Sequence, residues 1–192
     1  ISPKAINKYL NCPFSFYLEY VEEIREPRKL EEEEDGAFFG RLFHEIMRIL
    51  YEPYLGKVLE DQMFNIILEN RNIQSAKMSA LKTVFGLKSQ PEMQRYENKL
   101  IVDIVLKYVM AMINYDRDNG PLTLVSLEQK HNCELFFCDT NTNETQKVKI
   151  AGIIDRVDIH NGTHRVLDYK TGKIVQKVKS VDMLFEKNRK TE

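Results

Sequence analysis

The strongest structural signal in this 192-residue chain is AGIIDRVDIHNGTHRVLDYKTGK, residues 151–173. Asn161-Gly162 is the dipeptide preferred in tight hairpin turns, and β-forming residues flank it on both sides. If these two residues form the loop, His160 pairs with Thr163, and a symmetric four-residue loop from His160 to Thr163 gives the same register. We therefore predict an antiparallel hairpin whose register does not depend on the turn type.

This register places Asp155 directly opposite Asp168, and Lys170 projects from the same face. Two carboxylates whose Cβ atoms lie about 5 Å apart repel each other unless one is protonated, a cation lies between them or water screens both. Apolar neighbours such as Ile153 and Val157 favour partial burial, which weakens screening. A hard divalent ion explains the pair, because Mg²⁺ is usually held by one or two carboxylates. The alternative is a surface hairpin with an ordinary salt bridge.

Helical patterns dominate the first part of the chain. Ser2 followed by Pro3 indicates a helix start, and a second short helix is expected from about Pro13. The run EEEEDG at residues 31–36 is expected to be a solvated loop, because such a run of like charges is most often exposed. Residues 37–54 carry apolar side chains on one side of a helix that a proline ends.

The middle of the chain predicts further helices, and the last part predicts strands. One or two short amphipathic helices are expected within residues 58–87, and Ser89 with Glu92 forms a capping box for a long helix that ends at residues 119–121. Three strands are expected at residues 122–137, 148–159 and 165–169, with a polar turn at 139–145 and a loop leading into a helix at 171–192. This order predicts a mixed α/β (α+β) fold with a mostly helical N-terminal half and a small sheet.

Charge and composition exclude several classes of protein. The chain has 28 Lys and Arg against 29 Asp and Glu, and this net charge of -1 excludes nucleic-acid binding by bulk positive charge alone. The most apolar stretch, residues 100–113, is interrupted by charges and is shorter than the ~20 residues that a membrane span needs. Three cysteines, Cys12, Cys133 and Cys138, are too few for a disulfide framework. We expect a cytoplasmic protein with reduced thiols and no membrane association.

Four segments resemble the motifs of one nuclease family. Residues 152–158 (GIIDRVD) and 168–171 (DYKT) are similar to the GxxDRxD and DYKT motifs of the PD-(D/E)XK nuclease superfamily, in its RecB and AddB branch. Residues 40–45 (GRLFHE) are similar to the upstream GxxxHE helix of that branch, and residues 2–17 (SPKAINKYLNCPFSFY) to its opening segment. The resemblance implies a single domain over residues 1–192 with a restriction-endonuclease-like core and a small mixed sheet, in which residues 1–120 form the helical part and residues 121–192 the sheet with the active-site hairpin.

The resemblance also implies roles for particular residues. It implies that His44, Asp155 and Asp168 ligate a divalent metal, Mg²⁺ or Mn²⁺, with the backbone carbonyl of Tyr169 as a further ligand. Lys170 would then be the catalytic lysine. Without the resemblance, His44 would be interpreted as a helix histidine with a structural hydrogen bond.

Other polar residues near these motifs receive weaker assignments. Glu128 occupies the place of an acidic residue on the first core strand, so we give it a supporting catalytic role, although an exposed strand glutamate is the commoner case. Arg41 and Thr171 could reach a DNA phosphate near the metal. Arg156 and Asp158 share the strand face opposite to Asp155 and are expected to form a structural ion pair.

Two departures from the family pattern concern the cysteines and the end of the chain. Many relatives hold an iron–sulfur cluster with one cysteine in the opening segment and three near the C-terminus; Cys12 fits the first position, but no cysteine follows Cys138. Either this member lacks the cluster or the other ligands lie beyond Glu192, and we expect no cluster within this chain. The Gln and Tyr that follow the DYKT strand in relatives are not found, and the chain begins with Ile1. We therefore expect a C-terminally truncated piece of a larger protein.

The sequence thus predicts a divalent-metal-dependent DNA nuclease, acting as an exonuclease in repair or recombination with a helicase domain or subunit as a further partner. The alternative is a catalytically inactive nuclease-like module that binds DNA or a partner helicase subunit. A structural domain without a metal is the third hypothesis, and the facing carboxylates argue against it.

Overall fold

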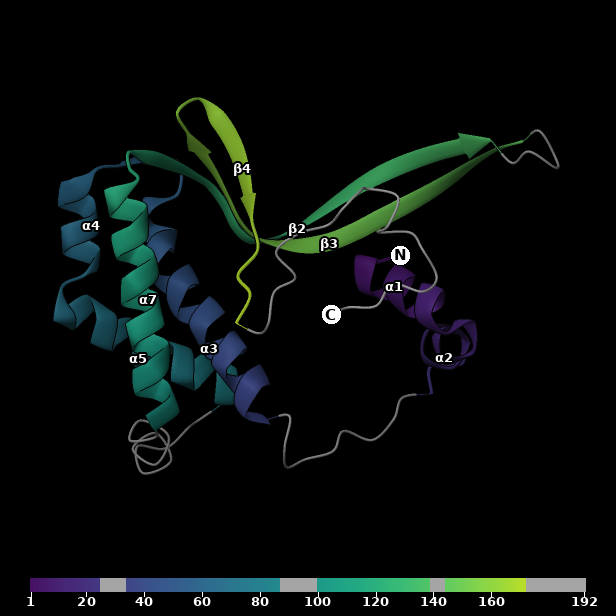
Figure 1. Cartoon of the computed structure of the whole chain (residues 1–192), viewed down its shortest axis with the longest axis horizontal. Coiled ribbons are helices and arrows are strands. Elements are labelled where there is room, and N and C mark those ends of the chain that lie inside the picture. Colours follow the sequence, from purple (N-terminus) through teal and green to yellow (C-terminus); the bar gives the residue numbers. More distant parts are fainter. Residues whose placement is uncertain (25–33, 87–99, 139–143, 172–192) are drawn as a thin grey trace. The chain divides into compact units, whose positions relative to one another are not determined.

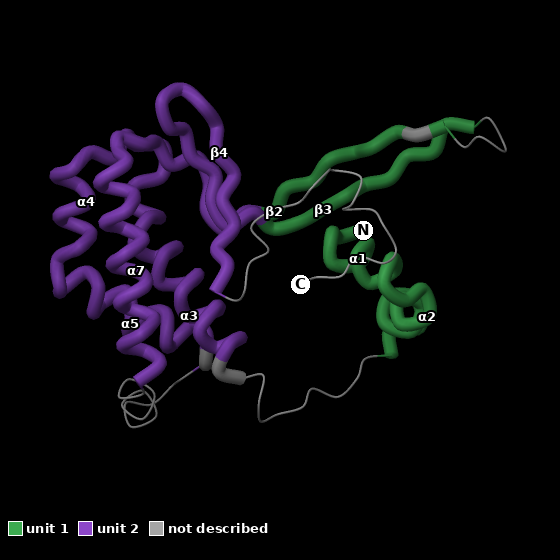
Figure 2. Tube along the Cα trace, in the orientation of Figure 1, with its two compact units in different colours: residues 1–29, 130–153, 173–192 green, residues 30–129, 154–172 purple. Residues whose placement is uncertain are grey.

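The computed structural model describes residues 1–24, 34–86, 100–138 and 144–171 (Figure 1). The chain divides into two compact units, which Figure 2 distinguishes by colour. Unit 1 comprises residues 1–29, 130–153 and 173–192, and unit 2 comprises residues 30–129 and 154–172. The two long strands, β2 (Leu122–Cys138) and β3 (Thr145–His160), contribute residues to both units. Each unit is therefore assembled from segments that are distant in the sequence.

Unit 2 contains the main apolar core, which lies between α3 (Glu34–Tyr51), α5 (Asn70–Phe85) and α7 (Leu100–Asp118). Apolar residues recur every three or four positions in each helix, so each helix has one apolar face. Fully buried side chains of this core include Leu42, Ile46, Leu81, Val105, Val109 and Ile113. Each such side chain contributes about 1.5–3 kcal/mol of hydrophobic stabilisation, and the core is therefore the main source of stability in this unit.

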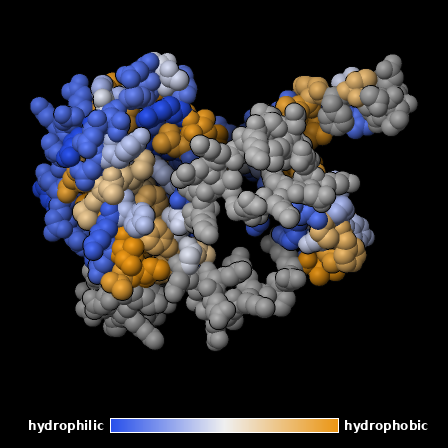
Figure 3. Space-filling view, in the orientation of Figure 1, coloured by the Kyte–Doolittle hydropathy of each residue, from blue (hydrophilic) through white to orange (hydrophobic). Residues whose placement is uncertain are grey.

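Shorter elements complete the helical layer. The 3₁₀ turn η2 (Glu52–Tyr54) follows α3 at Pro53, as the predicted stop required. Helix α4 (Asp61–Ile67) buries Phe64 and Ile67 against the same core. Figure 3 shows apolar side chains gathered where α7 begins, and Leu100 and Ile104 are exposed there.

Within the described ranges, we find no helical stretch with the length and apolar character of a membrane span.

The four-stranded sheet has the order β1-β2-β3-β4, so strands that are consecutive in the sequence are neighbours. The two-residue strand β1 (Val58–Leu59) pairs antiparallel with the start of β2, and β4 (Thr163–Leu167) pairs antiparallel with β3. Strand β1 was not predicted, because two residues are too few to show a periodic pattern. The predicted α+β class, with a helical N-terminal half and a small sheet, is confirmed.

The predicted register of the β3–β4 hairpin is confirmed. His160 pairs with Thr163, and the ladder continues to Arg156 opposite Leu167. The turn residues Asn161 and Gly162 both have positive φ, 49° and 75°, as a type I′ turn requires. The ladder ends at the pair of Arg156 and Leu167, because β4 ends at Leu167, one residue before Asp168.

Unit 1 contains the predicted N-terminal helices. Helix α1 (Pro3–Asn11) begins at Ser2, whose hydroxyl accepts a hydrogen bond from the Ala5 amide at 3.1 Å. Helix α2 (Pro13–Phe16) continues into the π-helical turn η1 (Tyr17–Val21). The ring of Phe16 contacts those of Tyr9 and Tyr20, with centroid distances of 5.4 and 5.1 Å. These ring contacts pack the short helices against each other.

The predicted boundaries differ from the observed ones in a few places. The loop predicted for residues 31–36 is wrong for its second half, because α3 already begins at Glu34. The rest of that loop, the capping box of Ser89 and Glu92, most of the turn at 139–145 and the segment 172–192 lie outside the described residues.

A buried charge cluster attaches the hairpin to the helices of unit 2. The guanidinium of Arg156 is fully buried and donates to Asp116 of α7 at 2.5 and 3.0 Å and to Asp158 of β3 at 2.7 Å. The hydroxyl of Tyr51 donates to Asp116 at 2.6 Å, and Arg165 of β4 donates to Asp158 at 2.7 Å. The predicted ion pair of Arg156 and Asp158 is therefore confirmed as part of a larger cluster.

The two helical members of this cluster, Asp116 and Tyr51, were not predicted from the sequence. Asp116 continues the buried series of α7, three residues after Ile113. A carboxylate among the positions that form the apolar face of a helix indicates a buried acid with a cationic partner. The spacing of Asp116 in the sequence carries this signal. Tyr51 gives no such signal, because a tyrosine on the apolar face of a helix is common.

The hairpin turn gives a first testable prediction. The variant Gly162→Ala should lower the free energy of unfolding by about 1 kcal/mol, because a Cβ is unfavourable at a φ of 75°. As a matched control, Gly36→Ala adds a Cβ in α3 where no atom lies within 4 Å, and it should leave stability unchanged or raise it. Urea unfolding measures both variants, and equal effects of the same sign would contradict the assigned turn.

The buried cluster gives a second prediction, which concerns acid stability. Burial alone would raise the pKa of Asp158, but hydrogen bonds and charge from Arg165 and Arg156 outweigh it and lower that pKa below its ordinary value. The stabilisation that the charged Asp158 carboxylate provides is therefore complete at pH values above the ordinary pKa of an aspartate. It is lost as the pH falls through the lowered pKa of the folded state. Arg165→Gln should raise the folded-state pKa of Asp158 and shift acid unfolding to higher pH.

The same variant should lower the free energy of unfolding at pH 7 by about 1–3 kcal/mol, because it removes hydrogen bonds to a buried carboxylate. The matched control is Arg71→Gln, since Arg71 forms an exposed pair with Glu69 and its loss should change little. Circular dichroism as a function of pH measures both midpoints. The assignment fails if the two variants unfold at the same pH as the wild type.

Candidate metal centre

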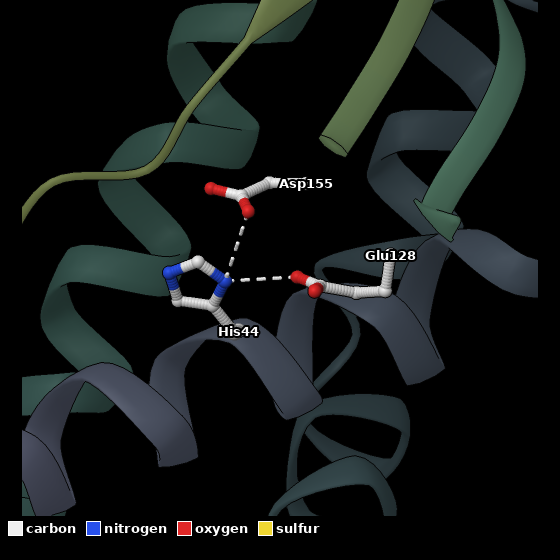
Figure 4. A group of neighbouring side chains, drawn as sticks. All are labelled: His44, Glu128 and Asp155. Carbon is white, nitrogen blue, oxygen red and sulfur yellow. Dashed lines mark hydrogen bonds and ion pairs between the residues drawn. The ribbon is translucent and has the colours of Figure 1, made fainter. Parts of the chain in front are cut away.

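Three potential metal ligands from three different elements converge in unit 2 (Figure 4). His44 comes from α3, Glu128 from β2 and Asp155 from β3, and their ligand atoms all lie within 4.8 Å of one another. The Nδ1 atom of His44 is 2.8 Å from a carboxylate oxygen of Glu128 and 3.8 Å from one of Asp155. The sequence separation of 84 residues between His44 and Glu128 shows that only folding brings these groups together.

Helix α3 presents His44 beside its buried face. Leu42, Phe43 and Ile46 are buried on this helix, and the half-buried imidazole lies at the edge of that apolar stripe. The second ring nitrogen, Nε2, lies 3.2 Å from the carbonyl oxygen of Tyr169. Both ring nitrogens therefore face oxygen atoms, which fixes the orientation of the ring.

Glu128 has an unusual backbone conformation. Its φ is 46°, in the left-handed region that residues other than glycine rarely occupy, although it lies inside strand β2. Such a conformation costs about 1–3 kcal/mol and is typical of functional sites, where it redirects a side chain. No sequence pattern predicts a left-handed glutamate within a strand, so the supporting role expected of Glu128 rests on the family resemblance and not on its backbone conformation.

Asp155 is held by the backbone of the segment that follows β4. Its side chain is only 11% exposed, and one carboxylate oxygen accepts a hydrogen bond from the Tyr169 amide at 2.6 Å. The other oxygen faces His44. This arrangement fixes the carboxylate and leaves one oxygen directed at the cluster.

Asp168 and Lys170 occupy a different environment. Their side chains are 59% and 61% exposed, and they pair with each other at 2.8 Å. In the part of the chain that the structure describes, Glu128 and not Asp168 joins His44 and Asp155 in the cluster. The physical reason is that β4 ends at Leu167, so the cross-strand register no longer constrains Asp168. Its predicted role as a ligand stays a prediction, as does the catalytic role of Lys170.

The two residues predicted to contact DNA lie on the surface of unit 2. Arg41 is exposed and donates to the carbonyl oxygen of Ala37, one turn earlier in α3, at 3.3 Å. Thr171 is exposed as well. Its hydroxyl oxygen lies close to Gly40, 3.5 Å from the position that a Cβ atom would have on that glycine. Both side chains are accessible to a phosphate, and their role in DNA binding stays a prediction.

Tyr169 lies at the centre of these contacts. Its ring meets those of Phe43 and His44 edge-on, with centroid distances of 5.4 and 5.6 Å. Burial raises the pKa of its phenol to about 12, although the charge of Arg156 acts in the opposite direction. The phenol is therefore neutral at physiological pH.

The residues of the cluster fit a divalent metal ion. The carboxylates of Glu128 and Asp155 have oxygen atoms within 4.8 Å of each other and repel, and a cation between them would relieve that repulsion. Carboxylate oxygens suit hard ions such as Mg²⁺ and Mn²⁺, and an imidazole nitrogen is a further common metal ligand. His44, Glu128 and Asp155 would hold the ion, with the Tyr169 carbonyl beside them.

Comparison with known protein families shows which family the chain belongs to. A family model for the PD-(D/E)XK nuclease superfamily matches residues 1–186. This chain belongs to the PD-(D/E)XK nuclease superfamily. The matched range contains His44, Glu128 and Asp155, so all three candidate ligands lie inside the superfamily region. Membership suggests a metal-dependent nuclease.

One curated relative extends the comparison. The chain is 25% identical over 183 residues to an uncharacterized protein of Rickettsia felis (strain ATCC VR-1525 / URRWXCal2). The match covers 92% of this chain and 19% of the relative, so the chain spans about a fifth of the length of that protein. No solved structure matches the chain.

The cluster gives a third prediction. Asp155→Asn and Glu128→Gln should each weaken Mn²⁺ binding about 10-fold or more, because each removes a charged ligand from the set. The matched control is Glu134→Gln, since Glu134 lies on the same strand as Glu128 but is exposed and paired with Lys147. Isothermal titration calorimetry measures the three affinities, and a wild-type affinity in Glu128→Gln would remove that residue from the ligand set.

Proposed function

We propose that this chain is a divalent-metal-dependent deoxyribonuclease that hydrolyses phosphodiester bonds. The observation that supports it best is the convergence of one imidazole and two carboxylates in a member of this superfamily. These groups come from a helix and two strands, so their grouping is a property of the fold and not of one local motif. Mg²⁺ or Mn²⁺ is the proposed cofactor.

A bound divalent ion would polarise the phosphate and make a water molecule nucleophilic near neutral pH. The residues of the chain have distinct roles around it. His44, Glu128 and Asp155 hold the ion, and the Tyr169 amide keeps one oxygen of Asp155 from rotating. In hydrolysis, water oxygen bonds to phosphorus, the bond from phosphorus to the leaving oxygen breaks, and a proton passes from the water to the leaving group.

Lys170 would stabilise the negative charge that develops on the phosphate oxygens or orient the attacking water. Its ammonium pairs with Asp168, and both side chains are exposed, so rotation of either costs little. A DNA phosphate competes with Asp168 for this ammonium, which would release the Asp168 carboxylate toward the cluster. Arg41 and Thr171 would contact neighbouring phosphates.

The finer proposal is an exonuclease of the RecB and AddB branch, acting in DNA repair or recombination in the cytoplasm. Its support is the order of four motifs along the chain, from residues 2–17 to residues 168–171. A helicase domain or subunit is the proposed partner. The match covers 19% of the relative from Rickettsia felis. That protein is a precedent for a region similar to this chain within a longer protein.

The second candidate is a catalytically inactive module that binds DNA or a partner helicase subunit. The observation in its favour is that Asp168 and Lys170 neutralise each other outside the cluster. The two candidates differ in what the wild-type protein does with Mn²⁺ and linear DNA, since an inactive module would leave the DNA intact.

The proposed function gives a fourth prediction. Asp168→Ala and Lys170→Ala should each lower Mg²⁺- or Mn²⁺-dependent degradation of linear DNA about 100-fold or more, because each removes a charge that acts in the transition state. Both side chains are exposed, so the free energy of unfolding should change by no more than about 0.5 kcal/mol. The matched control is Lys147→Ala, which removes another exposed lysine that pairs with an acid.

Release of acid-soluble nucleotides measures the activity, with linear duplex, linear single-stranded and closed circular DNA compared side by side. An exonuclease degrades the linear forms and spares the closed circle. Cleavage of the circle would contradict the exonuclease proposal, and unchanged activity in Lys170→Ala would contradict the role of the lysine.

A further inference from the structure

One residue connects the candidate metal centre to the buried charge cluster. The backbone of Tyr169 donates its amide to Asp155 at 2.6 Å, and its carbonyl oxygen lies 3.2 Å from His44. At the other end of the same residue, the phenol oxygen accepts a hydrogen bond from Arg156 at 3.3 Å. Tyr169 therefore contacts two of the three candidate ligands with its backbone and the charge cluster with its side chain.

The donor of that hydrogen bond is fixed in position. Arg156 is fully buried, and its planar guanidinium is held by Asp116 on one edge and Asp158 on the other. Its charge also lies over the ring of Tyr51, 5.3 Å from the centroid. A guanidinium bound in this way has no alternative rotamer of similar energy, because leaving either carboxylate unpaired in the interior is costly.

The segment that carries Tyr169 has no other firm attachment among its own side chains. Strand β4 ends at Leu167, so the ladder does not constrain residues 168–171. Asp168, Lys170 and Thr171 are exposed, whereas Tyr169 is partly buried and packs against the core. The side chain of Tyr169 is therefore the anchor of this segment.

We propose that Arg156 and the side chain of Tyr169 are positioning residues for the metal centre. By holding the phenol, Arg156 fixes the backbone of Tyr169, and that backbone orients Asp155 and His44. Groups that orient metal ligands contribute strongly to metal affinity although they never touch the ion. This inference rests on the proposed function, because it assigns the cluster a metal.

The hydroxyl of Tyr169 can be removed with little change in shape. Tyr169→Phe keeps the ring that packs against Phe43 and deletes only the group that Arg156 holds. The matched control is Tyr51→Phe, which deletes a phenol hydroxyl from the same charge cluster, where it donates to Asp116. The two variants therefore separate an effect on position from an effect on stability.

The expected result is a difference between the two variants in metal binding. Tyr169→Phe should weaken Mn²⁺ binding about 10-fold in titration calorimetry and lower kcat while changing KM for DNA little. Tyr51→Phe should lower the melting temperature at least as much and leave the Mn²⁺ affinity unchanged. A merely structural role of Tyr169 would lower the melting temperature without changing the affinity, and that result would overturn the inference.

A second measurement does not depend on metal or activity. The Tyr169 amide donates to a carboxylate, so its proton resonance should lie downfield in NMR spectra of the metal-free protein. In Tyr169→Phe the amide at position 169 should move upfield and exchange faster with solvent, and in Tyr51→Phe it should not. An unchanged amide in Tyr169→Phe would overturn the inference.

These results distinguish the inference from the proposed function. If wild-type protein binds Mn²⁺ and degrades DNA but Tyr169→Phe behaves the same, the proposed function stands and the positioning role is overturned. If wild-type protein binds no Mn²⁺, the proposed function fails. The NMR measurement of the amide at position 169 then still tests whether Arg156 anchors this segment. A variant of Arg156 would not separate these roles, because it would leave carboxylates unpaired in the interior and strongly destabilise the fold.

Discussion

The guanidinium of Arg156, buried between two carboxylates, fixes how strand β3 lies against helix α7. Removing a cation from water costs several kcal/mol, and only close pairing with Asp116 and Asp158 offsets that cost. Asp116 belongs to the helix and Arg156 to the strand, so the pairing requires one particular placement of the hairpin. The apolar core sets the position of the helix, and the ion pairs then set the hairpin on it.

The charged groups around the candidate metal centre lie in two environments. His44 and Asp155 are partly or mostly buried and have fixed hydrogen-bond partners. Asp168 and Lys170 are exposed and, among the described residues, pair with each other, so water can separate them at low cost. In the function proposed above, the first pair binds an ion before substrate arrives, and the second pair responds when a phosphate arrives.

Much of the fold and part of the site could be predicted from the sequence. Asn161-Gly162 and the alternating strands around it predicted the hairpin and its register correctly, because turn chemistry acts over only two residues. The grouping of Glu128 with His44 could not be predicted, because the φ of 46° at Glu128 and its distance to His44 depend on the folded chain. The predicted pairing of Asp155 with Asp168 is wrong by one residue, since the ladder ends at Leu167.

The sequence alone predicted the helices and strands, the hairpin register and the family motifs. These features depend on conformational preferences that act within a few residues. The folded chain added the grouping of His44 with Glu128, 84 residues later, and the link from Asp116 to Arg156, 40 residues later. Local preferences carry no information about such pairs. They form because a shared apolar core leaves only one arrangement in which the buried charges all have partners.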